Sequence, residues 1–144
     1  MIAIQTEFGE MQINEQDILK FDKGLYGFES VTEYILLSEE ENSPVLLLQP
    51  IRGQVPSFVV VDPYAVYPQY DPQMSKEDLH AFSEGDARDL RFLLIAALKD
   101  NPEESAVNLK SPVVIDSKTK KARQVILENQ DYPIRYRFLS KKEA

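Results

Sequence analysis

The stretch NLKSPVVID at residues 108–116, followed eight residues later by QVIL at 124–127, decides the fold class. Pro112 can begin a strand because it has no amide hydrogen to donate to a neighbouring strand. The apolar run Val113–Ile115 leads into a basic turn, SKTKK at 117–121, and then into the second apolar run. Two short apolar runs joined by a polar turn are typical of a β-hairpin. We therefore predict that 113–115 pairs with 124–127 as part of the core scaffold.

Short apolar runs of this kind recur along the whole chain. They are rich in Val, Ile, Leu, Phe and Tyr and are separated by turn residues such as Gly, Pro, Asn and Asp, a pattern typical of strands. The other runs are Ile2–Gln5, Met11–Ile13, Tyr34–Leu37, Val45–Ile51, Ser57–Val61, Leu90–Leu98, Ala106–Leu109 and Ile134–Phe138. We predict an all-β, mainly antiparallel fold: a small β-barrel-like single domain over residues 1–140, with 141–144 as a frayed tail.

One helix is predicted near residues 76–83. Ser75 can accept a hydrogen bond from the amide of Asp78 as N-cap, and the acids Glu77 and Asp78 stand in the first turn, where the helix dipole favours them. The segment 86–98 has good helix formers, but its neighbours are strand-like, so we predict a buried strand for Arg91–Leu98.

Two glycine-rich or proline-rich segments are predicted to be irregular. In FDKGLYGFES at 21–30, Gly24 and Gly27 can adopt positive φ, which lets Leu25 and Phe28 point inward. The segment VVVDPYAVYPQYDP at 59–72 runs from a strand into an extended, helix-averse loop with three tyrosines.

Residue types that usually carry chemistry are scarce. The chain has no Cys, and its one histidine, His80, is best read as a surface residue. There is no GxSxG turn, phosphate-binding glycine loop or calcium-loop spacing. We therefore predict no catalytic residues, no metal and no cofactor, although a pair of catalytic carboxylates among the 24 acids stays an open alternative.

The sequence also bears on location. The start of the chain lacks a signal-peptide pattern, and the longest apolar run, Phe92–Leu98, is too short to span a bilayer. We expect a cytoplasmic protein with no membrane partner.

The charge is unevenly distributed. Residues 1–104 hold 20 acids and 7 bases, a net of −13, and residues 105–144 hold 4 acids and 9 bases, a net of +5. A negative body disfavours direct binding of nucleic acid, whose affinity comes mainly from Lys and Arg. The acidic surface either only keeps the protein soluble or steers it toward a basic protein.

Candidate partner-binding residues lie mainly in the acidic, aromatic loop and the helix after it. Tyrosine beside acids is typical of protein-binding patches, although these tyrosines could instead face the core. The candidates are Asp62, Tyr67, Tyr70, Asp71, Glu77 and Asp78, with Asn108 and Lys110 as secondary candidates near the edge of the predicted hairpin.

The chain resembles the FliW family of bacterial flagellar assembly factors. The resemblance rests on the order and spacing of GLYGFE at 24–29, LLLQP at 46–50, FVVVDP at 58–63, YDP at 70–72, NLKSPVVID at 108–116 and QVIL at 124–127. The chain departs from the family pattern at Tyr26, where Pro is usual, and at Asp116, where Asn is usual.

The resemblance implies a non-enzymatic partner switch. Proteins of the family bind flagellin and, when free of flagellin, bind the translational repressor CsrA and relieve its repression of flagellin mRNA allosterically. An alternative is an acidic β-domain chaperone or adaptor that acts only on flagellin. Two other classes stay open at this stage: an enzyme with perturbed carboxylates, and a direct nucleic-acid binder.

Overall fold

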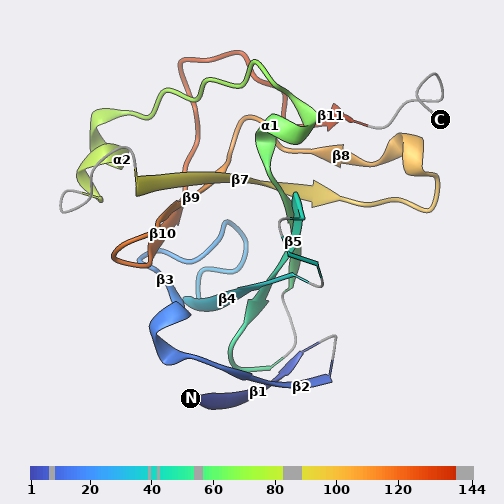
Figure 1. The fold of residues 1–144 in the computed structure, drawn as a ribbon. Coiled ribbons are helices and arrows are strands. Elements are labelled where there is room, and N and C mark those ends of the chain that lie inside the picture. The colour runs from blue at the N-terminus through green and yellow to red at the C-terminus, as the bar shows by residue number, and fades with distance from the viewer. Residues whose placement is uncertain (7–8, 39, 42, 54–56, 83–88, 139–144) are drawn as a thin grey trace.

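The computed structural model describes residues 1–6, 9–38, 40–41, 43–53, 57–82 and 89–138. Among these residues, seven strands form a closed barrel (Figure 1). They are β3 (Leu19–Phe21), β4 (Glu33–Leu37), β5 (Val45–Pro50), β6 (Phe58–Val61), β7 (Leu90–Ala97), β9 (Val113–Asp116) and β10 (Lys121–Gln124). Neighbouring strands run antiparallel except β3 and β10, which are parallel. The all-β, barrel-like prediction is confirmed.

Strand β7 belongs to the barrel and to an arm that extends from it. Its first half, Leu90–Leu93, pairs with β9 and closes the barrel. Its last residues, Ala96 and Ala97, pair instead with β8 (Ala106–Val107), and β8 pairs with β11 (Tyr136–Arg137). The arm therefore continues the sheet beyond the barrel, at the upper right of Figure 1.

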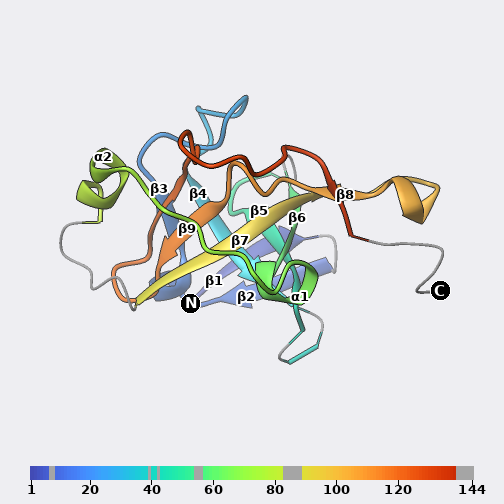
Figure 2. The ribbon, with the colours of Figure 1, turned by 90° about the horizontal axis from the view of Figure 1, so that it is seen from above.

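A separate hairpin packs against the outer face of β4 and β5. Strands β1 (Ile2–Thr6) and β2 (Gly9–Ile13) pair only with each other, as a two-stranded sheet. The hairpin lies below the barrel in Figure 1. It lies behind the barrel in Figure 2, which shows the molecule from above. Because it has no backbone ladder with the barrel, its attachment depends on side-chain packing.

The apolar side chains form three cores. One fills the barrel and includes Tyr34, Leu48 and Leu93. A second lies under the hairpin, between β1–β2 and the outer face of β4–β5. A third covers the outer face of β7 and β9 beneath the segments 61–82 and 125–138. Strands buried on both faces read as continuous apolar runs, which explains the VVI sequence of β9.

Two short α-helices lie outside the barrel in the described residues. Helix α2 (Lys76–His80) begins at the predicted N-cap, Ser75, but ends earlier than the predicted residue 83, which lies outside the described residues. Helix α1 (Pro63–Val66) shows that the prediction of a helix-averse loop was wrong. Asp62 caps it and Pro63 stands at its first position, where proline's fixed φ favours a helix start. Short 3-10 turns occur at Glu15–Asp17 and Pro102–Glu104. None of the helices in the described part of the chain has the length and hydrophobicity needed to cross a bilayer.

The predicted hairpin forms, but its second strand begins earlier than expected. Ala122 pairs with Ile115 and Gln124 with Val113, so the strand is Lys121–Gln124 and not 124–127. The reversal is tight because Lys120 adopts a left-handed conformation with φ of 65°. Beyond the ladder, the amides of Val125 and Leu127 still donate to the carbonyls of Pro112 and Lys110.

The other local predictions have mixed outcomes. The strand predicted at Arg91–Leu98 is confirmed as β7. Gly24 and Gly27 both have positive φ, and Leu25 is buried, as predicted. Phe28 is 43% exposed, so its predicted inward position was wrong. Its ring packs edge-on against Phe58, a partly buried residue at the margin of the barrel core.

Candidate functional site

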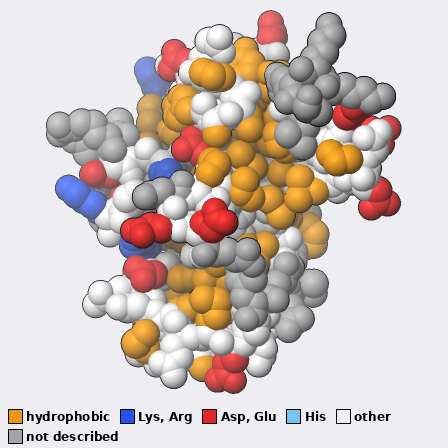
Figure 3. All heavy atoms as spheres, turned by 45° about the vertical axis from the view of Figure 1, so that its right-hand side comes forward, with side chains coloured by type: hydrophobic (Ala, Val, Ile, Leu, Met, Phe, Trp, Pro, Cys, Tyr) orange, Lys and Arg blue, Asp and Glu red, His pale blue; other side chains and the backbone are white. Residues whose placement is uncertain are grey.

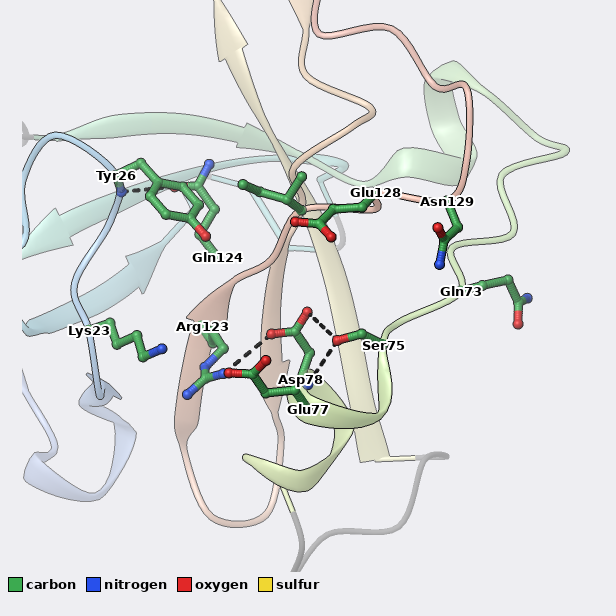
Figure 4. Close-up of a pocket in the computed structure, with 11 residues that line it drawn as sticks. Lys23, Tyr26, Gln73, Ser75, Glu77, Asp78, Arg123, Gln124, Glu128 and Asn129 are labelled. Atoms are coloured by element: carbon green, nitrogen blue, oxygen red, sulfur yellow. Dashed lines mark hydrogen bonds and ion pairs between the residues drawn. The ribbon is translucent and has the colours of Figure 1, made fainter.

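A polar recess of about 250 Å³ opens between α2 and the segment that follows β10 (Figure 4). We call it the α2 recess. Its walls come from residues 23–26, 73–78 and 123–129, which are far apart in the sequence. Glu77, Asp78 and Glu128 contribute carboxylates, and Lys23 and Arg123 contribute cations. The structure therefore places two of the predicted partner-binding residues in one concave site.

Arg123 on β10 connects α2 to the barrel. Its guanidinium donates to Asp78 Oδ1 at 3.3 Å and also pairs with the carboxylate of Asp22, which follows β3. The hydrogen bond from Arg123 favours the charged carboxylate and lowers the pKa of Asp22, and the same bond raises the pKa of Arg123. The Arg123 side chain is only 12% exposed. This ion network fixes α2 against the end of the barrel where β3 and β10 meet.

The N-terminus of α2 is closed by a reciprocal pair of hydrogen bonds. The Asp78 amide donates to Ser75 Oγ at 3.1 Å, and the Ser75 hydroxyl donates to Asp78 Oδ2 at 3.0 Å. Both oxygens of Asp78 therefore have partners within the protein. Glu77 and Glu128 are exposed and have no ion pair among the described residues. These two carboxylates are the ones that the recess offers to solvent.

Tyr26 forms part of the rim of the recess. Its amide donates to Gln124 Oε1 at 3.1 Å, and its side chain is 57% exposed. Burial and then the nearby charge of Asp78 raise the pKa of its hydroxyl. Exposed aromatic residues are enriched in protein–protein interfaces, so Tyr26 is a candidate contact residue.

Five tyrosines form a second candidate feature, the tyrosine cluster: Tyr64, Tyr67, Tyr70, Tyr132 and Tyr136. Tyr67 packs edge-on against Tyr70, Tyr132 and Tyr136, with ring centroids 5.3 to 6.4 Å apart. Hydrophobic side chains gather over the upper and central part of the face that Figure 3 shows. Tyr64 is 52% exposed, whereas Tyr67, Tyr132 and Tyr136 are half-buried. Tyr64 is therefore the member of the cluster that a partner could contact most fully without rearrangement.

Tyr70 faces the core. It is 3% exposed, its hydroxyl donates to the Leu109 carbonyl at 2.7 Å, and burial strongly raises its pKa. The core-facing alternative therefore holds for this tyrosine. Contact between Tyr70 and a partner stays a prediction that would require the loop to move.

Gln130 joins the aromatic loop to the segment around Lys110. Its Nε2 donates to the Asp71 carbonyl at 2.9 Å, and its Oε1 accepts from the Gln73 amide at 2.8 Å. The Lys110 ammonium donates to the Gln130 carbonyl. The Asn108 side chain is also hydrogen-bonded within the protein, because its Oδ1 accepts from the amides of Lys110 and Ser111 at 3.0 and 2.9 Å. Asn108 and Lys110 thus have clear structural roles, and their contact with a partner stays a prediction.

The predicted residues fall in two places. Glu77 and Asp78 lie at α2, and Asp62, Tyr67, Tyr70 and Asp71 lie at or after α1; Figures 1 and 2 both show the two helices well apart. Asp62 Oδ1 accepts from the Tyr64 amide at 3.0 Å, so Asp62 acts as a helix cap. Asp71 is exposed.

Sequence reasoning missed Arg123, Asp22 and Tyr26. No local signal marks the ion network, because Arg123 is separated from Asp22 by 101 residues and from Asp78 by 45. His80 is exposed, as expected. Among the described residues, no group of three or more His, Asp and Glu is placed to hold a metal ion.

Comparison with known proteins covers nearly the whole chain. A family model described as FliW protein matches residues 3–138. The chain is 35% identical over 138 residues to the flagellar assembly factor FliW of Syntrophus aciditrophicus, covering 96% of this chain and 87% of that protein. It is 35% identical over 136 residues to the flagellar assembly factor FliW of Thermotoga neapolitana, covering 94% and 91%.

A solved structure agrees with the sequence relatives. The chain matches a crystal structure of the flagellar assembly factor FliW with a TM-score of 0.88 at 28% identity, over 97% of this chain and 99% of that one. Both the family model and the relatives extend across the barrel, the arm and the hairpin. The chain therefore belongs to the FliW family.

Proposed function

We propose that this protein is a cytoplasmic, non-enzymatic flagellar assembly factor that binds flagellin and, when free of flagellin, binds CsrA. Binding of CsrA relieves its repression of flagellin mRNA translation allosterically. The observation that carries the proposal is the match to proteins named flagellar assembly factor FliW over nearly the full length of both chains.

The charge and geometry of the site are compatible with this role. Residues 1–104 carry a net charge of −13, and the α2 recess places exposed Glu77 and Glu128 beside the exposed ring of Tyr26. Such a surface favours association with a basic protein and repels a phosphate backbone that approaches nearby. The recess and its exposed carboxylates support a contact with a basic RNA-binding partner.

The first experiment is a calorimetric titration of the protein with purified CsrA and with monomeric flagellin, separately and in competition. We expect complexes with both and displacement of CsrA by flagellin. Binding of flagellin without binding of CsrA would favour the alternative, a chaperone or adaptor that acts only on flagellin. Absence of both complexes would refute the proposal.

Charge reversal then tests the site. Glu77→Lys and Asp71→Lys change exposed side chains, so they should weaken binding of CsrA without unfolding the protein. Glu10→Lys is the matched control, because Glu10 is an exposed acid on the β1–β2 hairpin at the other end of the molecule in Figure 1. An equal loss of affinity in all three variants would mean that only the net charge matters.

Ionic strength tests the electrostatic part of the mechanism. If repulsion of RNA contributes to antagonism, raising the salt concentration should reduce the antagonism after correction for the affinity of CsrA for RNA. Unchanged antagonism would exclude repulsion as the mechanism. It would not bear on the proposal that the protein binds flagellin and CsrA.

A further inference from the structure

A groove of about 480 Å³ lies where the β1–β2 hairpin meets the barrel strands β3, β4, β7 and β9. Its floor is apolar and comes from Met11 and Ile13 on the hairpin, Leu19 on β3, Ile35 and Leu37 on β4, and Ile115 on β9. Leu19 and Ile115 also belong to the core inside the barrel, whereas Ile13, Ile35 and Leu37 belong to the core under the hairpin. The groove therefore connects two apolar cores at the point where the hairpin leaves them incompletely covered.

Two cations line this apolar groove. Arg91 is opposite Ile115 in the β7–β9 ladder, and residues opposite each other on neighbouring strands project from the same face of a sheet. Lys120 lies in the β9–β10 turn and is half-buried. Neither has an ion-pair partner among the residues that the structure describes.

The local charge differs in sign from the charge of the whole chain. Asp17 is the one carboxylate among the residues described as lining the groove, against the two cations Arg91 and Lys120. The chain as a whole carries −8. A concave, largely apolar site with a small number of polar or charged groups is the usual form of a small-molecule site.

We propose that this groove binds a small amphiphile with an apolar chain and a single anionic group, such as a free medium-chain carboxylate. The apolar chain lies on the floor formed by Ile13, Ile35 and Leu37, and the anionic group pairs with Arg91 and Lys120. This site is distinct from the α2 recess and does not depend on the proposed binding of flagellin or CsrA.

The three methionines of the chain provide a direct readout. Met1 and Met11 line the groove, whereas Met74 packs against the core beneath the tyrosine cluster. Titration of methyl-labelled protein with decanoate, followed by nuclear magnetic resonance, should shift the Met1 and Met11 signals saturably and leave Met74 unchanged. Decyltrimethylammonium and decanol have the same apolar chain without the negative charge, and they should bind at least about tenfold more weakly. Equal binding of the three compounds, or shifts that include Met74, would overturn the proposal.

Substitution of the two cations tests their role. The double variant Arg91→Glu and Lys120→Glu should lose at least about tenfold in affinity for decanoate. The matched control is Arg52→Glu with Lys99→Glu, which makes the same charge change at exposed positions outside the groove and should keep its affinity. Equal losses in the two double variants would refute the pairing. In the unaltered protein, affinity for decanoate should fall as salt is added, and no salt dependence would refute it without any substitution.

Discussion

The Arg123 guanidinium and the Asp78 carboxylate lie 3.3 Å apart, although 45 residues separate them in the sequence. Arg123 is on a barrel strand and Asp78 is in the first turn of α2, so this pair sets the position of the helix relative to the barrel. It also sets one wall of the α2 recess.

Arg123→Ala should destabilise the protein. The change removes charged hydrogen bonds to Asp22 and Asp78, and a hydrogen bond of this kind contributes about 1.5–3 kcal/mol. We expect a loss of that order in the free energy of unfolding, measured with urea. Arg52→Ala, at an exposed arginine, should change it by less than about 0.5 kcal/mol. Similar values for the two variants would show that the ion network does not stabilise the fold.

The same network predicts a pH dependence. The pKa of Asp22 is lower in the folded protein than its ordinary value of 3.8, so its contribution is present above that value and is lost as pH falls through the folded pKa. Unfolding by urea at a series of pH values should show Asp22→Asn less stable than the unaltered protein at neutral pH. The difference should shrink in acid, and a difference independent of pH would contradict the assignment.

Removal of the hydroxyl should have different effects on stability at two buried tyrosines. Tyr70→Phe removes the hydroxyl that donates to the buried Leu109 carbonyl. It should lower the free energy of unfolding by about 1–3 kcal/mol. Tyr34 is fully buried, its hydroxyl has no hydrogen-bond partner in the described part of the chain, and burial raises its pKa to about 12. Tyr34→Phe should therefore leave stability unchanged or raise it by about 1 kcal/mol. The midpoints of thermal unfolding measure both, and a lower midpoint for Tyr34→Phe would show that its hydroxyl has a partner.

Gln49 is a buried polar side chain opposite Ile35 in the β4–β5 ladder, on the face that packs under the hairpin. It is 0% exposed, and among the residues that the structure describes neither its amide nitrogen nor its amide oxygen has a hydrogen-bond partner. Gln49→Met keeps a similar shape without the polar atoms and should stabilise the protein by about 1–2 kcal/mol. Gln5→Met, at an exposed position of β1, should have almost no effect. Destabilisation by Gln49→Met would imply that a buried water bonds the amide.

Gly24 and Gly27 have similar backbone conformations but different surroundings. A Cβ on Gly24 would lie 2.7 Å from backbone atoms of Glu29, whereas a Cβ on Gly27 would meet nothing within 4 Å. Both alanine variants bear the cost of positive φ, which is about 1 kcal/mol. We expect Gly24→Ala to lower the free energy of unfolding clearly more than Gly27→Ala. Equal effects would mean that the turn shifts to accommodate the methyl group.

Much of the fold could be predicted because strand signals are local. Nearly every apolar run corresponds to a strand, and the Ser75 cap identified the start of α2. Strand β3 was missed because its three residues, LKF, are too short to form a recognisable run. The limits of β10 were misplaced because the unusual conformation of Lys120 reverses the chain early, and residue type alone does not reveal it.

The site was only partly predictable. Acids and aromatic residues near 62–78 were recognised by composition, but composition does not distinguish exposed Glu77 from buried Tyr70. The residues that complete the recess, Arg123 and Tyr26, come from distant segments that meet only when the barrel closes. Their contribution depends on tertiary structure, which short-range sequence patterns do not encode.

The parallel pairing of β3 with β10 has a consequence for synthesis of the chain. Lys20 is aligned with Lys121, so the barrel cannot close until residues 101 positions apart have both left the ribosome. At a synthesis rate of about 5–20 residues per second, roughly 5–20 s pass between the synthesis of β3 and that of β10. Folding dominated by such distant contacts is slow, and an unpaired strand edge is open to aggregation during this interval. The early strands of the nascent protein are therefore where a ribosome-associated chaperone would have the most effect.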